Sequence, residues 1–297
     1  MLVGAGIALL TSLSWALSSI IIKPLTSRIP TLSINMIRMW LGSTLLLSFI
    51  LISGKYTAIP DIPLPSLIYV IVSGVLAMAI GDTSYIKSLS MLDASMAFPI
   101  AQCAFVLLAG LAAILWLNEP YTWITIAGAI LVMLGIYLVA SEGKGKAGPL
   151  QNKTVNMKGV VVALFAAVIW ASSTITLKIG AQGIDPFVVA AIRIFCSATV
   201  LTGLSAIRGN KGVFQLRQYG AKSLLMICGA GMLTYGVAAV GYVSAIQMIG
   251  AAKTVLLTTS APLFALFFSI IFLKERPTRS TVLGIIASVG GVVLVVI

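Results

Sequence analysis

The side chains that could do chemistry in this sequence are few, and nearly all of them occur twice at an offset of about 155 residues. The candidate binding residues are Trp15, Ser18, Ser19, Arg38, Tyr85, Trp170, Ser173, Thr174, Arg193, Tyr242 and Lys253. They offer aromatic surface, hydroxyl groups and positive charge, which together suit the binding of a small polar molecule.

Catalysis is not indicated by the residue types. The sequence has no His, which is the commonest general base and metal ligand. Its three cysteines, Cys103, Cys196 and Cys228, lie in separate apolar segments without metal-ligand or redox spacing. A membrane enzyme is the competing class, and we predict no catalytic residue, no metal ion and no cofactor.

The two tryptophans share a helix face with hydroxyl groups. Positions 15, 18 and 19 lie on one side of a helix, as do positions 170, 173 and 174. This face predicts part of a cavity wall. The alternative is that the hydroxyl groups only help neighbouring helices to pack closely.

Cations recur at depth in the predicted helices. Arg38 and Arg193 each lie six or seven residues inside a helix, where they could snorkel to the interface. Alternatively they lie near opposite mouths of a pathway, as gates or as anchors for substrate carboxylates. Lys253 has no counterpart in the first half, so it is either a further carboxylate anchor or a snorkelling residue at a helix start.

Asp82 is the only acidic residue that the predicted spans place at depth, so a structural ion pair with Lys87 or Arg38 is expected. The remaining excess of positive charge favours substrates that carry a carboxylate. A single buried Asp in a sequence without His gives no indication of proton coupling. Tyr85 and Tyr242 line the cavity or belong to the interfacial aromatic belt.

The composition is that of an α-helical membrane protein, with 60% hydrophobic and 9% charged residues. A bilayer core needs about 20 apolar residues per helix. The sequence supplies ten continuous apolar runs, near 2–22, 32–53, 64–89, 94–117, 121–140, 159–179, 186–207, 221–246, 251–273 and 279–297. We therefore predict an all-α polytopic fold with ten transmembrane helices.

The chain repeats itself. Five runs in residues 1–140 match five in residues 158–297, and the Gly-, Lys- and Pro-rich stretch 141–157 reads as a hydrated linker. An odd number of spans inverts the second copy relative to the first. Inverted five-helix repeats are typical of alternating-access transporters.

The net charge of +12 is distributed as in a membrane protein rather than a nucleic-acid-binding protein. Of the 19 Lys and Arg residues, about fourteen fall on one predicted side, which includes the linker. The positive-inside rule therefore predicts a cytoplasmic linker and outward-facing termini in a cell membrane, with lipids as neighbours. The first apolar run lacks a basic start and a cleavage site, so it reads as the first span rather than a signal peptide.

Other recurring residues are predicted to be structural. Glu119 and Glu275 end helices, and Thr122 and Thr278 then cap the next ones. Glycines space one face of the last helix in each half for close approach, at positions Gly128, Gly135, Gly284, Gly290 and Gly291. This face predicts packing within the chain, with a homodimer seam through either last helix as the alternative.

These residues together resemble the EamA-type family of the drug/metabolite transporter superfamily, over essentially all of both halves. The matching positions are Trp15, Lys23, Arg38, Glu119, Pro120, Thr122, Gly128 and Gly135, and then Trp170, Lys178, Arg193, Pro262, Glu275, Pro277, Thr278, Gly284 and Gly291. Departures are Ala16 and Ala171 in place of a usual Gly, and Val106 where the second half has Pro262. The resemblance implies a ten-helix transporter with a cavity between the repeats, for export or exchange of amino acids or related metabolites. A lipid or lipid-phosphate translocator of the same fold is the alternative.

Overall fold

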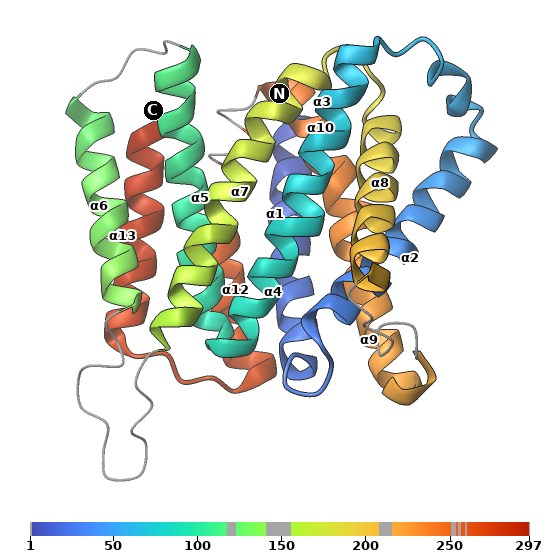
Figure 1. Ribbon diagram of the computed structural model, residues 1–297. Coiled ribbons are helices and arrows are strands. Elements are labelled where there is room, and N and C mark those ends of the chain that lie inside the picture. The colour runs from blue at the N-terminus through green and yellow to red at the C-terminus, as the bar shows by residue number, and fades with distance from the viewer. Residues whose placement is uncertain are drawn as a thin grey trace.

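The computed structural model describes residues 2–117, 123–140, 156–207, 216–250, 254, 257–258 and 260–296. Every regular element in these residues is a helix, and the long helices run side by side in one bundle (Figure 1). Backbone groups in a lipid core must be hydrogen-bonded within the protein, which a helix achieves by itself. The predicted all-α class is therefore confirmed.

The first half contains α1 (Leu2–Ile22), α2 (Thr31–Ile52), α3 (Leu64–Gly74), η3 (Val75–Asp82), α4 (Thr83–Met91), α5 (Ala94–Leu117) and α6 (Trp123–Ala140). The second half contains α7 (Met157–Gly180), α8 (Pro186–Ile207), α9 (Ala221–Gly231), η7 (Met232–Ala238), α10 (Ala239–Ile249), α12 (Ala261–Leu273) and α13 (Arg279–Val296). Short turns of 3-10 helix are η1 (Lys23–Leu25), η2 (Lys55–Ala58) and η6 (Leu216–Tyr219). The predicted runs agree with these elements to within a few residues.

Within the described residues, six helical stretches are long and apolar enough to cross a membrane, so the chain is an integral multi-pass membrane protein. They are Leu2–Leu25, Thr31–Ile52, Leu64–Met91, Met157–Gly180, Pro186–Ile207 and Ala221–Ile249. Shorter apolar stretches of helix are Ala94–Ala109, Ile126–Gly135 and Ala261–Leu273. The count of ten spans stays a prediction.

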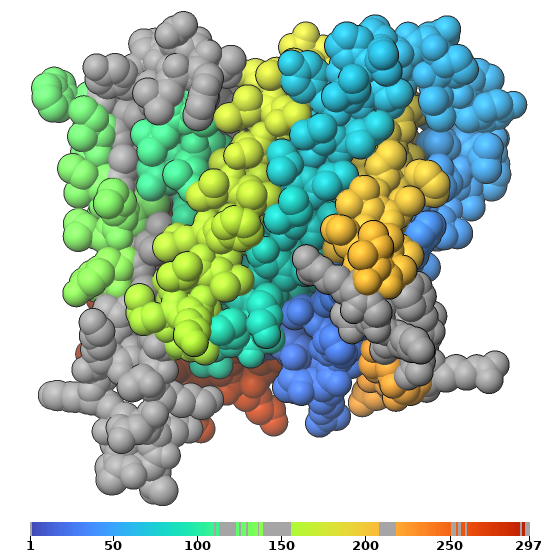
Figure 2. Space-filling view, viewed as in Figure 1, coloured from blue at the N-terminus to red at the C-terminus, as the bar shows by residue number. Residues whose placement is uncertain are grey.

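Corresponding helices of the two halves run in opposite directions. In Figure 1, α1 descends where α7 ascends, α2 ascends where α8 descends, and α1 begins at the same end of the bundle where α13 finishes. The halves also interlock, because α3 packs between α7 and α8 of the second half on the face seen in Figure 2. Which end faces the cytoplasm stays a prediction.

Two of the membrane-crossing stretches are not α-helical along their whole length. In both Leu64–Met91 and Ala221–Ile249, α-helix gives way to a wider π-type turn, at η3 and η7 respectively. Such turns are rare and occur frequently at functional sites. The repeat therefore places one irregular segment in each half, at matching positions near the middle of the bundle.

The glycine face predicted for the last helices lies between α6 and α13. A Cβ on Gly135 would stand 2.5 Å from the Gly284 carbonyl oxygen, and one on Gly291 would stand 2.6 Å from that of Gly128. Only glycine allows backbones to approach so closely. Packing within the chain is confirmed, and the predicted homodimer seam through this face is not supported because the face is already occupied.

The turn between α4 and α5 is held by residues from other helices. The Glu275 carboxylate accepts hydrogen bonds from the backbone N–H groups of Ala94 and Ser95, each 3.0 Å long, and so caps α5. Lys23 Nζ donates to the carbonyl oxygens of Leu89 and Leu92 at the end of α4. Glu275 is therefore structural, as predicted, but it caps a helix of the opposite half.

Thr278 also behaves as predicted, because its hydroxyl oxygen accepts a 3.3 Å hydrogen bond from the Thr281 N–H in the first turn of α13. Glu119 and Thr122 lie outside the described residues.

Candidate functional site

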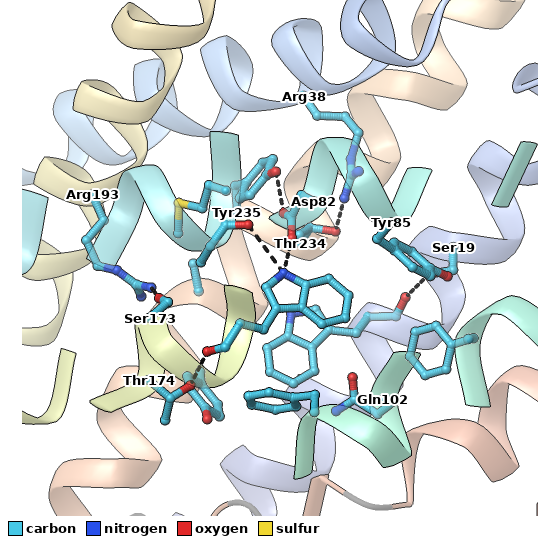
Figure 3. A pocket seen from close by; sticks show the side chains of 18 residues that line it. Ser19, Arg38, Asp82, Tyr85, Gln102, Ser173, Thr174, Arg193, Thr234 and Tyr235 are labelled. Carbon is cyan, nitrogen blue, oxygen red and sulfur yellow. Dashed lines mark hydrogen bonds between the residues drawn. The ribbon is translucent and has the colours of Figure 1, made fainter. Parts of the chain in front are cut away.

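A cavity of about 120 Å³ lies between the two halves, in the middle of the bundle (Figure 3). Its walls come from α1, α2, η3, α4 and α5 of the first half and from α7, α8, η7 and α10 of the second. The lining residues are Trp15, Ser19, Arg38, Ala77, Met78, Asp82, Tyr85, Phe98, Gln102, Phe105, Trp170, Ser173, Thr174, Arg193, Thr234, Tyr235, Ala239 and Tyr242.

Each half contributes one arginine to the cavity in the same way. Arg38 Nη2 donates to Ser18 Oγ at 3.3 Å, and Arg193 Nη2 donates to Ser173 Oγ at 3.4 Å. The two arginines are only 4% and 5% exposed. Snorkelling is therefore wrong for both, and the structure brings both to one cavity rather than to separate mouths.

The two serines tie the halves together. Ser18 Oγ donates to the Ala230 carbonyl oxygen of the second half at 3.0 Å. Ser173 Oγ donates to the Ser73 carbonyl oxygen of the first half at 2.7 Å. Each guanidinium group is thus oriented by a serine of its own half that is itself fixed by the backbone of the other half.

Two glycines allow this arrangement. A Cβ on Gly74 would stand 2.7 Å from Arg193 Cα, and one on Gly231 would stand 3.0 Å from Arg38 Cα. Both glycines immediately precede the irregular segments η3 and η7. The arginine-bearing helices α8 and α2 can therefore press directly against the broken helices of the opposite half.

Aromatic pairs form the apolar walls, and they also cross between halves. Trp15 packs on Tyr242 with ring centroids 5.2 Å apart, and Trp170 packs on Tyr85 at 5.4 Å. The angle between the ring planes is 51° in the first pair and 47° in the second. Tyr85 and Tyr242 are 6% exposed, so they line the cavity and are not part of an interfacial belt.

The symmetry breaks at Asp82. Its carboxylate accepts a hydrogen bond from Trp170 Nε1 at 2.9 Å and lies 2.6 Å from the Tyr235 hydroxyl oxygen. The matching residue of the second half is Ala239, which has no polar group. No Lys or Arg nitrogen of the described residues lies within 4.0 Å of the carboxylate, so the expected ion pair with Lys87 or Arg38 is wrong.

The surroundings of the two arginines differ as well. Arg38 Nη2 also donates to Thr234 Oγ1 at 2.7 Å, and its guanidinium carbon lies 5.2 Å from the centre of the Tyr235 ring. At the position that corresponds to Thr234, the environment of Arg193 has Ala77. The Arg193 guanidinium group therefore makes fewer hydrogen bonds within the described residues than that of Arg38.

Several buried donors around the cavity lack a partner within the described structure. Among them are Arg38 Nε, Arg193 Nε and Gln102 Nε2. Buried polar groups are almost always hydrogen-bonded, and each exception calls for a reason. All three residues line the cavity, where an acceptor on a bound molecule would satisfy them.

Most predicted site residues lie at the cavity, although their detailed roles vary. Ser18 stands behind Arg38 rather than in the wall. The hydroxyl groups of Ser19 and Thr174 donate to the carbonyl oxygens of Trp15 and Trp170, one helical turn earlier, at 2.9 and 3.0 Å. Lys253 lies outside the described residues.

Sequence reasoning missed Gln102, Thr234 and Tyr235 as cavity residues and read Asp82 as part of an ion pair. The repeat draws attention to residues that occur twice, and these four occur once. A difference between the halves would also have been a usable signal. In an apolar run, a polar residue whose counterpart in the other half is apolar marks such a site, as with Asp82 and Ala239 or Tyr235 and Met78.

Comparison with known proteins agrees with this architecture. The EamA-like transporter family matches residues 2–141 and again residues 157–297. A protein of Archaeoglobus fulgidus described as an uncharacterized transporter is 24% identical over 236 residues, which cover 80% of this chain and 78% of that protein. The uncharacterized transporter YoaV of Bacillus subtilis is 26% identical over 143 residues, or 47% of this chain and 46% of its own.

A solved crystal structure is similar over nearly the whole chain. Its TM-score is 0.69 at 17% identity, and the alignment covers 98% of this chain and 95% of that one. At this level of identity the likeness shows the fold alone.

Proposed function

The chain belongs to the EamA-like transporter family, and we propose that it is a secondary transporter for small carboxylate-bearing metabolites, amino acids among them. It works by alternating access across the cell membrane, as an exporter or exchanger. Membership of a transporter family favours a transporter over an enzyme. The observation that carries the substrate class is the pair of buried arginines facing one central cavity.

A guanidinium group binds a carboxylate through two parallel N–H donors. Arg193 uses Nη2 on a serine and Arg38 uses Nη2 on a serine and on Thr234, and both leave Nε without a partner in the described residues. Both guanidinium groups line the cavity, and we assign their unpaired Nε–H groups as donors to an anion there. Because each arginine is linked to the backbone of the opposite half through its serine, an anion held there is coupled to both halves.

The rest of the cavity suits a small, partly apolar molecule. The Trp15–Tyr242 and Trp170–Tyr85 pairs present ring surface, and a volume of about 120 Å³ is close to that of cavities that hold a benzene-sized ligand. A lipid headgroup with its chains does not fit this volume. The lipid or lipid-phosphate translocator is therefore the weaker proposal.

The test is transport by the purified protein in liposomes, with labelled amino acids and small organic acids as substrates and fluorescent lipids as the competing probe. Arg38→Gln and Arg193→Gln should each slow carboxylate uptake roughly tenfold to a hundredfold, because a hydrogen bond to a charged group is worth about 1.5–3 kcal/mol. Arg28→Gln is the matched control, since Arg28 is exposed. If Arg38→Gln and Arg193→Gln take up carboxylates as fast as the control variant does, the proposal is contradicted. If the protein moves only the lipid probes, the translocator is favoured.

Lys253 is proposed as an additional carboxylate anchor. Lys253→Ala should then weaken transport of a carboxylate more than that of its amide. An equal loss for both compounds would point to a structural role.

The ten-span topology and its orientation are parts of the same proposal. Their support is the family match in two segments, the opposed directions of corresponding helices and the basic residues of the 141–157 linker. Cysteine labelling from either side of the membrane, at the linker and at the N-terminus, tests whether the linker is cytoplasmic and the termini are outside.

A further inference from the structure

The hydrogen bonds around Asp82 leave one hydrogen atom unaccounted for. Oδ1 of Asp82 accepts from Trp170 Nε1, which is a donor only. Oδ2 lies 2.6 Å from the hydroxyl oxygen of Tyr235, so a hydrogen atom must lie between these two oxygens. The question is whether Tyr235 or Asp82 supplies it.

The hydrogen bonds of Asn35 bear on this question, because they fix the orientation of its side-chain amide group. Its side-chain Nδ2 lies 2.8 Å from the Met78 carbonyl oxygen, which can only accept, and 2.8 Å from Thr83 Oγ1. Both amide hydrogens are therefore used. Asn35 Oδ1 can only accept, and the Tyr235 hydroxyl oxygen lies 2.8 Å from it.

The Tyr235 hydroxyl group thus faces two acceptors with a single hydrogen atom. If Tyr235 donates to an ionised Asp82, the Asn35 oxygen and the Tyr235 oxygen face each other without a hydrogen atom between them. If Asp82 carries a proton on Oδ2, Asp82 donates to Tyr235, Tyr235 donates to Asn35, and every group is satisfied. The unmade hydrogen bond costs the ionised arrangement about 1–3 kcal/mol. Withdrawing a charged carboxylate from bulk water adds to that cost, so we take the second arrangement as the one that the contacts favour.

We propose that Asp82 is a proton-binding site of the transport cavity and that its protonation is coupled to binding of an anion at Arg38 and Arg193. The proton comes from hydronium in the solvent, which is left as water, and forms the O–H bond on Oδ2. As it binds, the hydrogen atom of Tyr235 turns from Asp82 to Asn35. The second half of the proposal, the coupling to an anion, rests on the proposed function.

The groups that face Asp82 come from every wall. Arg38 on α2 and Arg193 on α8 interact with it through charge, Tyr85 on α4 lies near it, and Trp170 on α7 and Tyr235 on η7 bond to it directly. The two arginine charges favour ionised Asp82, but neither guanidinium group is within ion-pair distance. The withdrawal of the carboxylate from bulk water and the hydrogen-bond arrangement at Tyr235 and Asn35 oppose these two charges.

Charge explains why the proton and the anion bind together. With Asp82 ionised, the charged residues of the described cavity lining sum to +1, and with Asp82 neutral they sum to +2. A carboxylate at the arginines is then not repelled by a second carboxylate in the same small cavity. By linkage, the anion must favour the proton by the same factor. The proton and the anion are therefore bound, and transported, together.

The proton site is tested first without any substrate, by infrared difference spectroscopy of the whole purified protein. The sequence has seven Asp and Glu residues in all, so few carboxyl bands overlap. At neutral pH, the wild type should show the carbonyl stretch of a buried protonated acid. Asp82→Asn should lack this band, while Asp61→Asn, a change at an exposed loop residue, should keep it.

Two properties of the variants make this test sharp. An Asn at position 82 has the same shape as the neutral acid and can accept from Trp170 and donate to Tyr235, so the variant should fold. Tyr235→Phe removes the proposed acceptor and should shift the band without abolishing it. A wild-type spectrum without the band, or a band that persists in Asp82→Asn, overturns the proton site.

The coupling is tested by calorimetric titration with benzoate, with neutral benzamide as the control ligand. Above the pH at which Asp82 loses its proton, wild-type affinity for benzoate should fall by up to about tenfold per pH unit, because the ionised form binds the anion more weakly. Asp82→Asn should bind benzoate with little pH dependence, and Asp61→Asn should resemble the wild type. Wild-type affinity that does not change with pH overturns the coupling. Failure of benzoate to bind at any pH counts against the carboxylate cavity instead, while the infrared band alone decides the proton site.

Discussion

Gly74 provides the strictest test of how the two halves fit together. Its Cα lies against the backbone of Arg193, and a Cβ there would stand 2.7 Å from both the Cα and the carbonyl oxygen of Arg193. Ordinary contacts of this kind begin near 3.4 Å, so Gly74→Ala must separate α3 from α8 by about 0.7 Å. Both clashing atoms are backbone atoms, so no side-chain rotation can relieve the contact.

The expected loss is about 1–3 kcal/mol of unfolding free energy, the usual range for overpacking a tight interior. Gly231→Ala repeats the experiment in the other half, where the Cβ would stand 3.0 Å from Arg38 Cα and the helices need separate by only about 0.4 Å. Its loss should therefore lie at the lower end of the range. Gly203→Ala in α8 is the control, because nothing lies within 4 Å of its Cβ position. It should gain about 0.5–1 kcal/mol from reduced chain flexibility.

Thermal unfolding in detergent, followed by the monomeric fraction in gel filtration, measures all three variants. The predicted order of stability is Gly203→Ala, wild type, Gly231→Ala and then Gly74→Ala. If Gly74→Ala unfolds at the temperature of the control, the two halves are not in direct backbone contact at this point, and the proposed reason for the position of Arg193 fails.

Further predictions concern other contacts between the halves. Glu275→Gln keeps one acceptor for α5 but loses the charge and the second hydrogen bond, so unfolding free energy should fall by about 0.5–2 kcal/mol; no change would mean that the cap contributes nothing. Asp185→Asn removes the ion pair with Lys55. The Asp185 side chain is 29% exposed and that of Lys55 35%, so the loss of unfolding free energy should stay under about 1 kcal/mol; a larger loss would mean that solvent does not weaken this pair. Substrate binding should quench tryptophan emission, and a Trp15→Phe and Trp170→Phe double variant should lose that quenching; an unaltered response would remove both residues from the site.

The fold was predictable because lipid leaves a sequence few options. Long apolar runs must be helices, and their boundaries in the sequence agree with α1, α2 and α8 to within about a residue. The irregular segments η3 and η7 were not foreseen. They begin after Gly74 and Gly231, but a glycine in an apolar run predicts only a close approach and does not give the direction of the contact.

The candidate site was predictable where the repeat marks it and not elsewhere. Trp15, Arg38 and their counterparts were found because the same residue type recurs in register. The depth of a side chain could not be judged, since an Arg six residues inside a helix can either snorkel or turn inward, and only the neighbouring helix decides. The partners of Asp82 were missed for a related reason, because Trp170 and Tyr235 come from helices of the other half whose proximity no spacing reveals.

The serine-mediated contacts have a consequence for how such a protein can arise. Ser18 reaches the backbone of the second half and Ser173 that of the first, so neither repeat completes its own arginine site. A shorter ancestor with a single repeat would therefore need two copies inserted in opposite orientations in the same bilayer. Fusing the two into one polypeptide fixes their ratio and lets the two copies differ, as they do at Asp82 and Ala239.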